Sequence, residues 1–147
     1  IILWAGHCSV HQQFRPEHVD LWRKHHPDIN VIVHPECAME VVDKADYIGS
    51  TAQIIKTIEA APAGSKWAVG TEIHMVNRVK EANPDKFITL LSPFACLCST
   101  MYRISPLDLA NVLENLVEGR VINQIIVPEE VSRNAKLALD RMLAIPK

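Results

Sequence analysis

The sequence has no long apolar run and no excess of charge of one sign. Its opening apolar stretch, residues 1–5, is far shorter than the roughly 20 residues that a membrane helix needs, and no basic flank or cleavage pattern follows it. The 15 lysine and arginine residues are balanced by 17 aspartate and glutamate residues, so no basic stripe is available for a phosphate backbone. We therefore expect a soluble, cytoplasmic protein that binds neither membranes nor nucleic acid.

Cysteine is also scarce, with four residues in 147. This number is too small for a disulfide scaffold, and Cys96 and Cys98 are too close in sequence to pair comfortably with each other. Reduced thiols, some of them metal ligands, are the better interpretation. The chain begins at Ile1 in strand-like sequence without an initiator methionine, so we expect it to be part of a longer protein.

What the sequence does contain is 48% hydrophobic residues, enough for a globular core. Short β-branched runs alternate with amphipathic stretches over the first ninety residues, which is typical of parallel strands joined by crossover helices. The predicted fold class is α/β. Strands are predicted at 1–5, 30–34, 47–49, 66–70 and 87–91, and helices at 16–26, 38–45, 51–60 and 73–82.

The pattern changes after Cys98. Ser105 and Pro106 predict the N-cap and first turn of a helix that ends near Glu118. A short strand is predicted at 124–127, and a last helix begins at Pro128.

Polar residues follow the predicted strands, where open parallel sheets bind their ligands. Cys8 and Cys98 lie in such loops, in positions that can present a soft-metal ligand to a central cavity. Each cysteine alone is better explained as a small buried apolar residue, and only the two together favour a metal site. Cys96 and Cys98 also suggest half of a zinc site, but no matching second pair exists in the sequence.

Two further loops carry polar candidates. His34 and Glu36 place an imidazole and a carboxylate at one strand end, as general acid–base chemistry requires, although strand and helix capping explain both residues too. Ser50 and Thr51 open a predicted helix and offer hydroxyls and backbone amides to a phosphate or carboxylate. Ordinary helix capping accounts for the same two residues.

The motifs, taken in order, resemble the quinolinate synthase family over nearly the whole chain. The segment 4–11, with Cys8 at its centre, looks like the family's tryptophan–glycine–cysteine segment, with Ala5 in place of the usual proline. The segment 98–101 is similar to the family's last cluster cysteine and the methionine after it. The other matching segments are 34–37, 49–51 and 70–72.

The resemblance implies the carboxyl-terminal part of an enzyme built from three similar αβα domains with pseudo-threefold symmetry. Such enzymes hold a [4Fe-4S] cluster through one cysteine from each domain. Cys8 and Cys98 would be two of these ligands, and the third would lie upstream of this chain. On this mapping residues 1–8 end a preceding domain, 9–98 form a complete three-layer αβα domain with a short parallel sheet, and 99–147 pack against the missing first domain.

The implied reaction condenses iminoaspartate with dihydroxyacetone phosphate to quinolinate in de novo NAD biosynthesis, with the cluster as a Lewis acid. A functional link to L-aspartate oxidase is implied as well. His34 and Glu36 would be the catalytic and substrate-binding pair, and Ser50 and Thr51 would bind an anionic group. The isolated fragment is expected to be inactive.

Two other functions are compatible with the residues themselves. One is a non-catalytic, flavodoxin-like α/β module whose strand-end hydroxyls bind a phosphorylated ligand. The other is a zinc or mononuclear iron hydrolase that uses His7, Cys8 and His11, although one loop does not readily turn all three toward one ion.

Overall fold

The computed structural model describes residues 5–94 and 97–145. It divides into two compact units, residues 1–103 and 104–147, which we call the α/β unit and the helical unit. Within the described ranges no helix is both long and apolar enough to cross a membrane. The domain division predicted at 8/9 and 98/99 stays a prediction.

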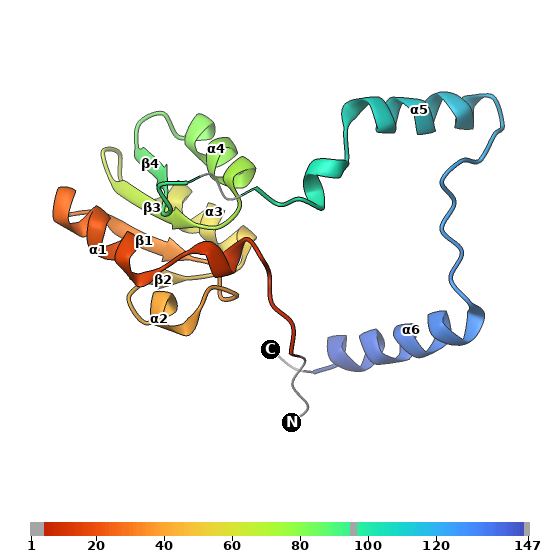
Figure 1. Cartoon of the computed structure of the whole chain (residues 1–147), viewed down its shortest axis with the longest axis horizontal. Helices are drawn as coiled ribbons and strands as arrows, with labels where there is room; N and C mark the ends of the chain where they lie inside the picture. Colours follow the sequence, from red (N-terminus) through yellow and green to blue (C-terminus); the bar gives the residue numbers. More distant parts are fainter. Residues whose placement is uncertain (1–4, 95–96, 146–147) are drawn as a thin grey trace. The chain divides into compact units, whose positions relative to one another are not determined.

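A four-stranded parallel sheet with strand order β2-β1-β3-β4 forms the centre of the α/β unit (Figure 1). Its strands are β1 (Asn30–Val33), β2 (Tyr47–Ile48), β3 (Lys66–Gly70) and β4 (Phe87–Leu90). Helix α1 (Pro16–His25) precedes β1, and the crossover helices are α2 (Met39–Val42), α3 (Thr51–Ala60) and α4 (Ile73–Ala82). Two 3-10 turns are η1 (His11–Gln13) and η2 (Met101–Arg103).

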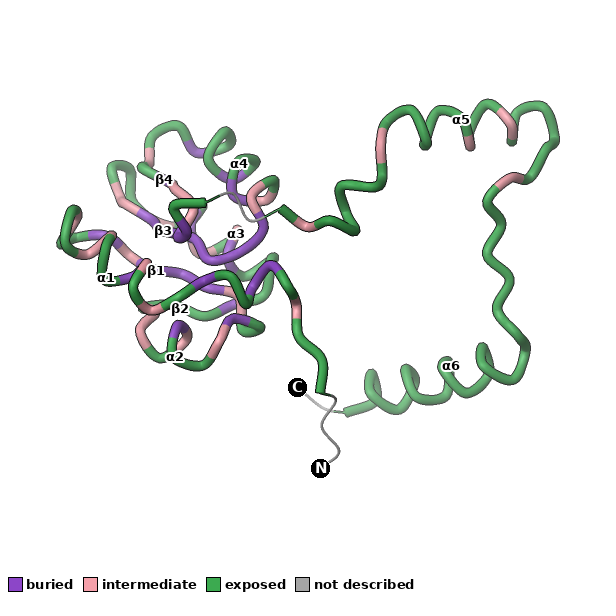
Figure 2. Tube along the Cα trace, viewed as in Figure 1, coloured by how far each residue is buried: buried purple, intermediate pink, exposed green. Residues whose placement is uncertain are grey.

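Alternate residues of the central strands point to opposite faces of this sheet, and each face has its own apolar cluster. On β1, Val31 and Val33 pack with Val19 of α1 and Val41 of α2. Ile32 faces the other way, into a cluster formed with α3 and α4. The central strands are buried between the two layers of helices (Figure 2). The second cluster comprises Ile32, Ile54, Ile58, Trp67, Val69, Val76, Val79 and Ile88. The predicted three-layer αβα architecture is confirmed.

Both tryptophans that the structure describes are anchored in this unit. Trp67 of β3 is only 3% exposed, its indole N–H donates to Ser65 Oγ at 3.0 Å, and its ring lies 5.3 Å from that of Tyr47. Trp22 of α1 donates to the carbonyl oxygen of Leu91 at 3.0 Å. The second bond ties α1 to the end of β4.

The sequence prediction is most accurate where periodicity and capping agree. Helices α3 and α4 and strand β3 have the predicted bounds. The N-cap of α3 is a capping box, in which Ser50 Oγ accepts from the Gln53 N–H and Gln53 Oε1 accepts from the Ser50 N–H. The N-cap of α4 is Glu72, whose carboxylate accepts from the His74 and Met75 N–H groups.

Helix α2 is shorter than the predicted 38–45. The Asp46 carboxylate accepts a hydrogen bond of 2.7 Å from the Val31 N–H and pairs with Arg23 at 2.8 Å. These contacts draw the chain back to β1 and end the helix early. The strand predicted at 1–5 lies outside the described residues except for Ala5, which is not in a strand.

The helical unit contains α5 (Pro106–Val117) and α6 (Glu129–Leu143). Ser105 caps α5 as predicted, with its Oγ accepting from the Asp108 N–H at 3.1 Å. No described residue of either helix is buried. The strand predicted at 124–127 is wrong, because this segment has no strand partner among the described residues and Ile125 and Ile126 are exposed.

Candidate functional site

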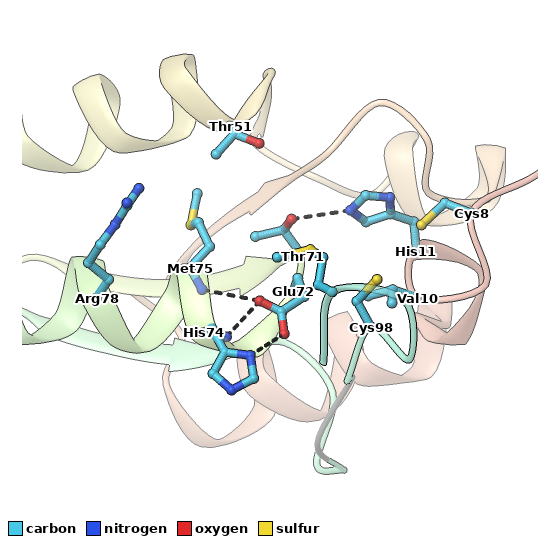
Figure 3. A pocket seen from close by; sticks show the side chains of 11 residues that line it. Cys8, Val10, His11, Thr51, Thr71, Glu72, His74, Met75, Arg78 and Cys98 are labelled. Atoms are coloured by element: carbon cyan, nitrogen blue, oxygen red, sulfur yellow. Dashed lines mark hydrogen bonds and ion pairs between the residues drawn. The ribbon is translucent and has the colours of Figure 1, made fainter. Parts of the chain in front are cut away.

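A cavity of about 430 Å³ lies at the carboxyl ends of the central strands of the α/β unit (Figure 3). The loop before η1, the N-terminus of α3, the start of α4 and the segment after β4 all contribute to its wall. This is the edge where the sequence predicts a ligand site. The lining residues are Cys8, Val10, His11, Thr51, Thr71, Glu72, His74, Met75, Arg78, Cys98 and Met101.

His11 is the central polar residue of this region and is 8% exposed. Its Nδ1 lies 2.9 Å from Glu36 Oε2, and its Nε2 lies 3.1 Å from Thr71 Oγ1. Its ring stacks on that of His34, with centroids 4.3 Å apart and planes 5° from parallel. The imidazole is therefore held on both nitrogens and on one face.

His34 lies at the end of β1 and is half-buried. Burial lowers its pKa below the ordinary value of 6.5, the neighbouring His11 lowers it further, and the Glu36 carboxylate partly offsets both. The Glu36 backbone N–H donates to His34 Nδ1 at 3.3 Å, whereas the carboxylate is 3.7 Å away, too far for a hydrogen bond. The lowered pKa favours the neutral imidazole, and a neutral ring that accepts at Nδ1 carries its proton on Nε2.

The two predicted metal-ligating cysteines line the same cavity. Cys8 and Cys98 come from segments ninety residues apart in sequence, and both are half-buried. A hydrogen bond between the Cys98 thiol and Thr100 Oγ1, at 3.0 Å, lowers the pKa of that thiol, and the Met101 backbone N–H lowers it further. Thiolate is the form that binds metal, so these residues fit an iron–sulfur cluster.

Of the two predicted anion-binding residues, Thr51 lines the cavity and Ser50 does not. Ser50 is engaged in the capping box of α3, as the capping interpretation predicts. Its hydroxyl accepts the Gln53 N–H, so its own O–H remains available to donate.

Glu36 borders a second cavity, of about 510 Å³, together with Cys8 and His7. Its side chain is 58% exposed, so this carboxylate is open to a ligand while it pairs with His11. Cys8 lines both cavities and so connects the cavity of Cys98 with that of Glu36, whereas His34 borders neither of the two.

Comparison with known proteins settles the family. A family model described as quinolinate synthetase A protein matches residues 1–144. The chain belongs to the quinolinate synthetase A family. It is 66% identical to a quinolinate synthase of Herpetosiphon aurantiacus, 57% to one of Rhodopirellula baltica and 55% to one of Anoxybacillus flavithermus.

These alignments cover 98–99% of this chain but only 37–39% of each relative. The chain thus spans about two fifths of the length of these members of the quinolinate synthetase A family. Membership favours an enzyme over the flavodoxin-like binding module and the mononuclear hydrolase. It does not by itself assign roles to His34, Glu36, Ser50 or Thr51.

Sequence reasoning missed part of this site. It named His11 only as a ligand in the hydrolase alternative and did not select Thr71. Both residues follow predicted structural elements, but their convergence depends on how η1 packs over β3. Cys37 is buried in the core, where its thiol donates to the Gly70 carbonyl at 3.5 Å, and Cys96 lies outside the described residues.

Proposed function

We propose that this chain is the carboxyl-terminal part of a quinolinate synthase that condenses iminoaspartate with dihydroxyacetone phosphate to quinolinate, for NAD biosynthesis. The main support is the convergence of Cys8 and Cys98 on one cavity in a member of the quinolinate synthetase A family. The proposal extends to a cytoplasmic location and to supply of iminoaspartate by L-aspartate oxidase.

Cys8 and Cys98 would hold two irons of a [4Fe-4S] cluster, and the remaining three fifths of a protein of the relatives' length would supply the third cysteine. When bound, the cluster supplies a Lewis-acidic iron that polarises a substrate oxygen or nitrogen. The hydrogen bond from Thr100 favours the Cys98 thiolate needed for this binding.

His34 would orient substrate. Because its Nδ1 accepts the Glu36 N–H, its Nε2–H is available to donate to a substrate oxygen. The lowered pKa keeps the ring neutral near pH 7, so it acts as a hydrogen-bond donor rather than as a fixed positive charge.

Glu36 would take and return protons during isomerisation and dehydration. Its exposed carboxylate can reach a substrate, and its Oε2 is paired with His11 Nδ1. Thr71 binds the opposite nitrogen of His11, so the three side chains form a continuous hydrogen-bonded series. A proton accepted at Glu36 can therefore be shared with the imidazole without leaving the site.

Thr51 and Ser50 would bind an anionic group of substrate or product. Thr51 stands at the first position of α3 and lines the cavity, where its hydroxyl can donate to a phosphate or carboxylate oxygen. Ser50 can donate its hydroxyl proton at the same helix end while it caps α3.

The test joins this chain to the remaining part of the Herpetosiphon aurantiacus relative and reconstitutes the protein anaerobically with iron and sulfide. We expect a brown protein with roughly four irons per chain, and loss of colour in Cys8→Ala and in Cys98→Ala. Cys37→Ala is the matched control, because this cysteine packs in the core, and it should retain the cluster.

Quinolinate formation from the two substrates is then measured on the same preparations. Glu36→Gln and His34→Asn should retain the cluster and lose most activity, by roughly 10²-fold or more for loss of a general acid or base. A colourless wild-type protein would argue against the cluster. A coloured protein that makes no quinolinate would argue against the reaction.

A further inference from the structure

Cys8, which the cluster would use, also forms a second group of metal-ligand type with His11 and Glu36, two residues that are not cluster ligands. One ligand atom from each residue lies within 4.8 Å of the other two. The residues come from separate segments, because Cys8 precedes η1 and His11 is its first residue, whereas Glu36 follows β1. The Cys8–His11 loop by itself offers only two of these ligands, and Glu36 supplies the third from a second segment.

The donors match a borderline-soft divalent ion. Zinc binds thiolate, imidazole and carboxylate at about 2.0–2.3 Å, commonly with three protein ligands and one open position. The 2.9 Å between His11 Nδ1 and Glu36 Oε2 is close to the separation of two ligand atoms on one such ion. The cavity that Cys8 and Glu36 border leaves room for water in the fourth position.

The surroundings of His11 also suit a metal ligand. Histidines that bind metal through one ring nitrogen usually donate the other N–H to a polar partner. Thr71 Oγ1 lies 3.1 Å from Nε2, so it can accept that proton while the Nδ1 lone pair faces the ion. Stacking against His34 fixes the plane of the ring, and the residue is 8% exposed.

We propose that Cys8, His11 and Glu36 bind a zinc ion when no cluster is present, and that this ion withholds Cys8 from cluster assembly. On binding, the Cys8 thiol loses its proton to solvent. The proton of the neutral His11 ring moves from Nδ1 to Nε2, where Thr71 Oγ1 accepts it, and the His11–Glu36 hydrogen bond is replaced by two bonds to the metal. Only the second half of this inference rests on the proposed function, because zinc binding by itself requires no iron.

The experiment uses the full chain, prepared under anaerobic reducing conditions without iron or sulfide. Zinc affinity is measured by competition with a chromophoric chelator, and cobalt(II) serves as the spectroscopic probe. We expect one ion per chain and a thiolate-to-cobalt charge-transfer band that disappears in Cys8→Ser. Glu36→Gln should weaken zinc binding by at least about tenfold, as loss of a metal-site partner does.

Two controls separate this site from other arrangements. Glu40→Gln changes an exposed carboxylate of α2, and Cys98→Ser removes the other cavity thiol; both should bind zinc like the wild type. Unchanged affinity in Glu36→Gln, or lost affinity in Cys98→Ser, would overturn the site. Far-ultraviolet circular dichroism checks that each variant is folded.

The competition is tested on the chimera with the Herpetosiphon aurantiacus relative. Preloaded zinc should reduce cluster incorporation in the wild type and have a much smaller effect in Glu36→Gln. Equal incorporation with and without zinc would overturn the competition. Failure to form a cluster even without zinc would instead count against the proposed function, so the two failures are distinguishable.

Discussion

The α/β unit and the helical unit show what amphipathic patterning achieves with and without a partner surface. In the α/β unit, Ile54 and Ile58 of α3 are fully buried against the sheet. In the helical unit, Leu107 and Val117 of α5 are 81% and 88% exposed. Both α3 and α5 have a serine N-cap and a helical apolar period, so local signals specify a helix in both, but only the sheet provides a core.

The largest expected difference is in amide hydrogen exchange of the intact chain. Amides of β1 and β3 should exchange at least roughly 10³-fold more slowly than amides of α5 and α6, because a folded core contributes about 5 kcal/mol and unburied helices contribute almost none. Exchange followed by mass spectrometry measures both regions together. Similar protection in all four elements would mean that the helical unit has a core of its own.

The next largest difference is expected in the free energy of unfolding when an apolar side chain of each unit is truncated. Ile58→Ala removes a fully buried side chain and should lower the free energy of unfolding by about 2–5 kcal/mol. Leu113→Ala, on the half-exposed surface of α5, should change it by less than about 0.5 kcal/mol. Urea unfolding followed by circular dichroism makes the comparison, and a large loss in Leu113→Ala would contradict it.

Removing either serine N-cap should change stability less than the truncation of Ile58 does. Ser50→Ala should lower the free energy of unfolding of the α/β unit by about 1 kcal/mol, because α3 folds together with the sheet. Ser105→Ala should instead reduce helix content at the start of α5 and leave the cooperative transition unchanged. An equal shift of that transition in both variants would show that the units unfold together.

Acidification should affect the α/β unit through His34. Its folded-state pKa lies below the ordinary 6.5 because burial and His11 disfavour the charged ring, so folding favours the neutral form. This stabilisation is fully present above pH 6.5 and is lost as the pH falls through the folded-state pKa. Stability measured at several pH values should fall less steeply in His34→Gln, and identical slopes would contradict this assignment.

Much of the α/β unit is predictable because its determinants are local. The continuous apolar run of β3 and the Ser50 capping box give the bounds of β3 and α3 directly. The failed strand at 124–127 has the right residue types, but strand formation needs hydrogen bonds from another segment. A single sequence shows which residues suit a strand, but not whether a partner is present.

The candidate site illustrates the same limit. Strand-end reasoning found Cys8, Cys98 and Thr51, which all line the main cavity. The central position of His11 was not predicted, because it depends on contacts with Glu36 and with Thr71, which is sixty positions away. Contacts of this kind arise from the packing of η1 over the sheet, which no local period reveals.

The anchored tryptophans have a practical consequence for optical work. Trp22 and Trp67 lie in the α/β unit, and the sequence has no Phe, Tyr or Trp after Tyr102. Fluorescence from Trp22 and Trp67 therefore follows the sheet and its helices, Trp4 lies outside the described residues, and no aromatic residue reports directly from α5 or α6. One aromatic residue introduced into α6, such as Leu139→Trp, would give the helical unit a signal of its own.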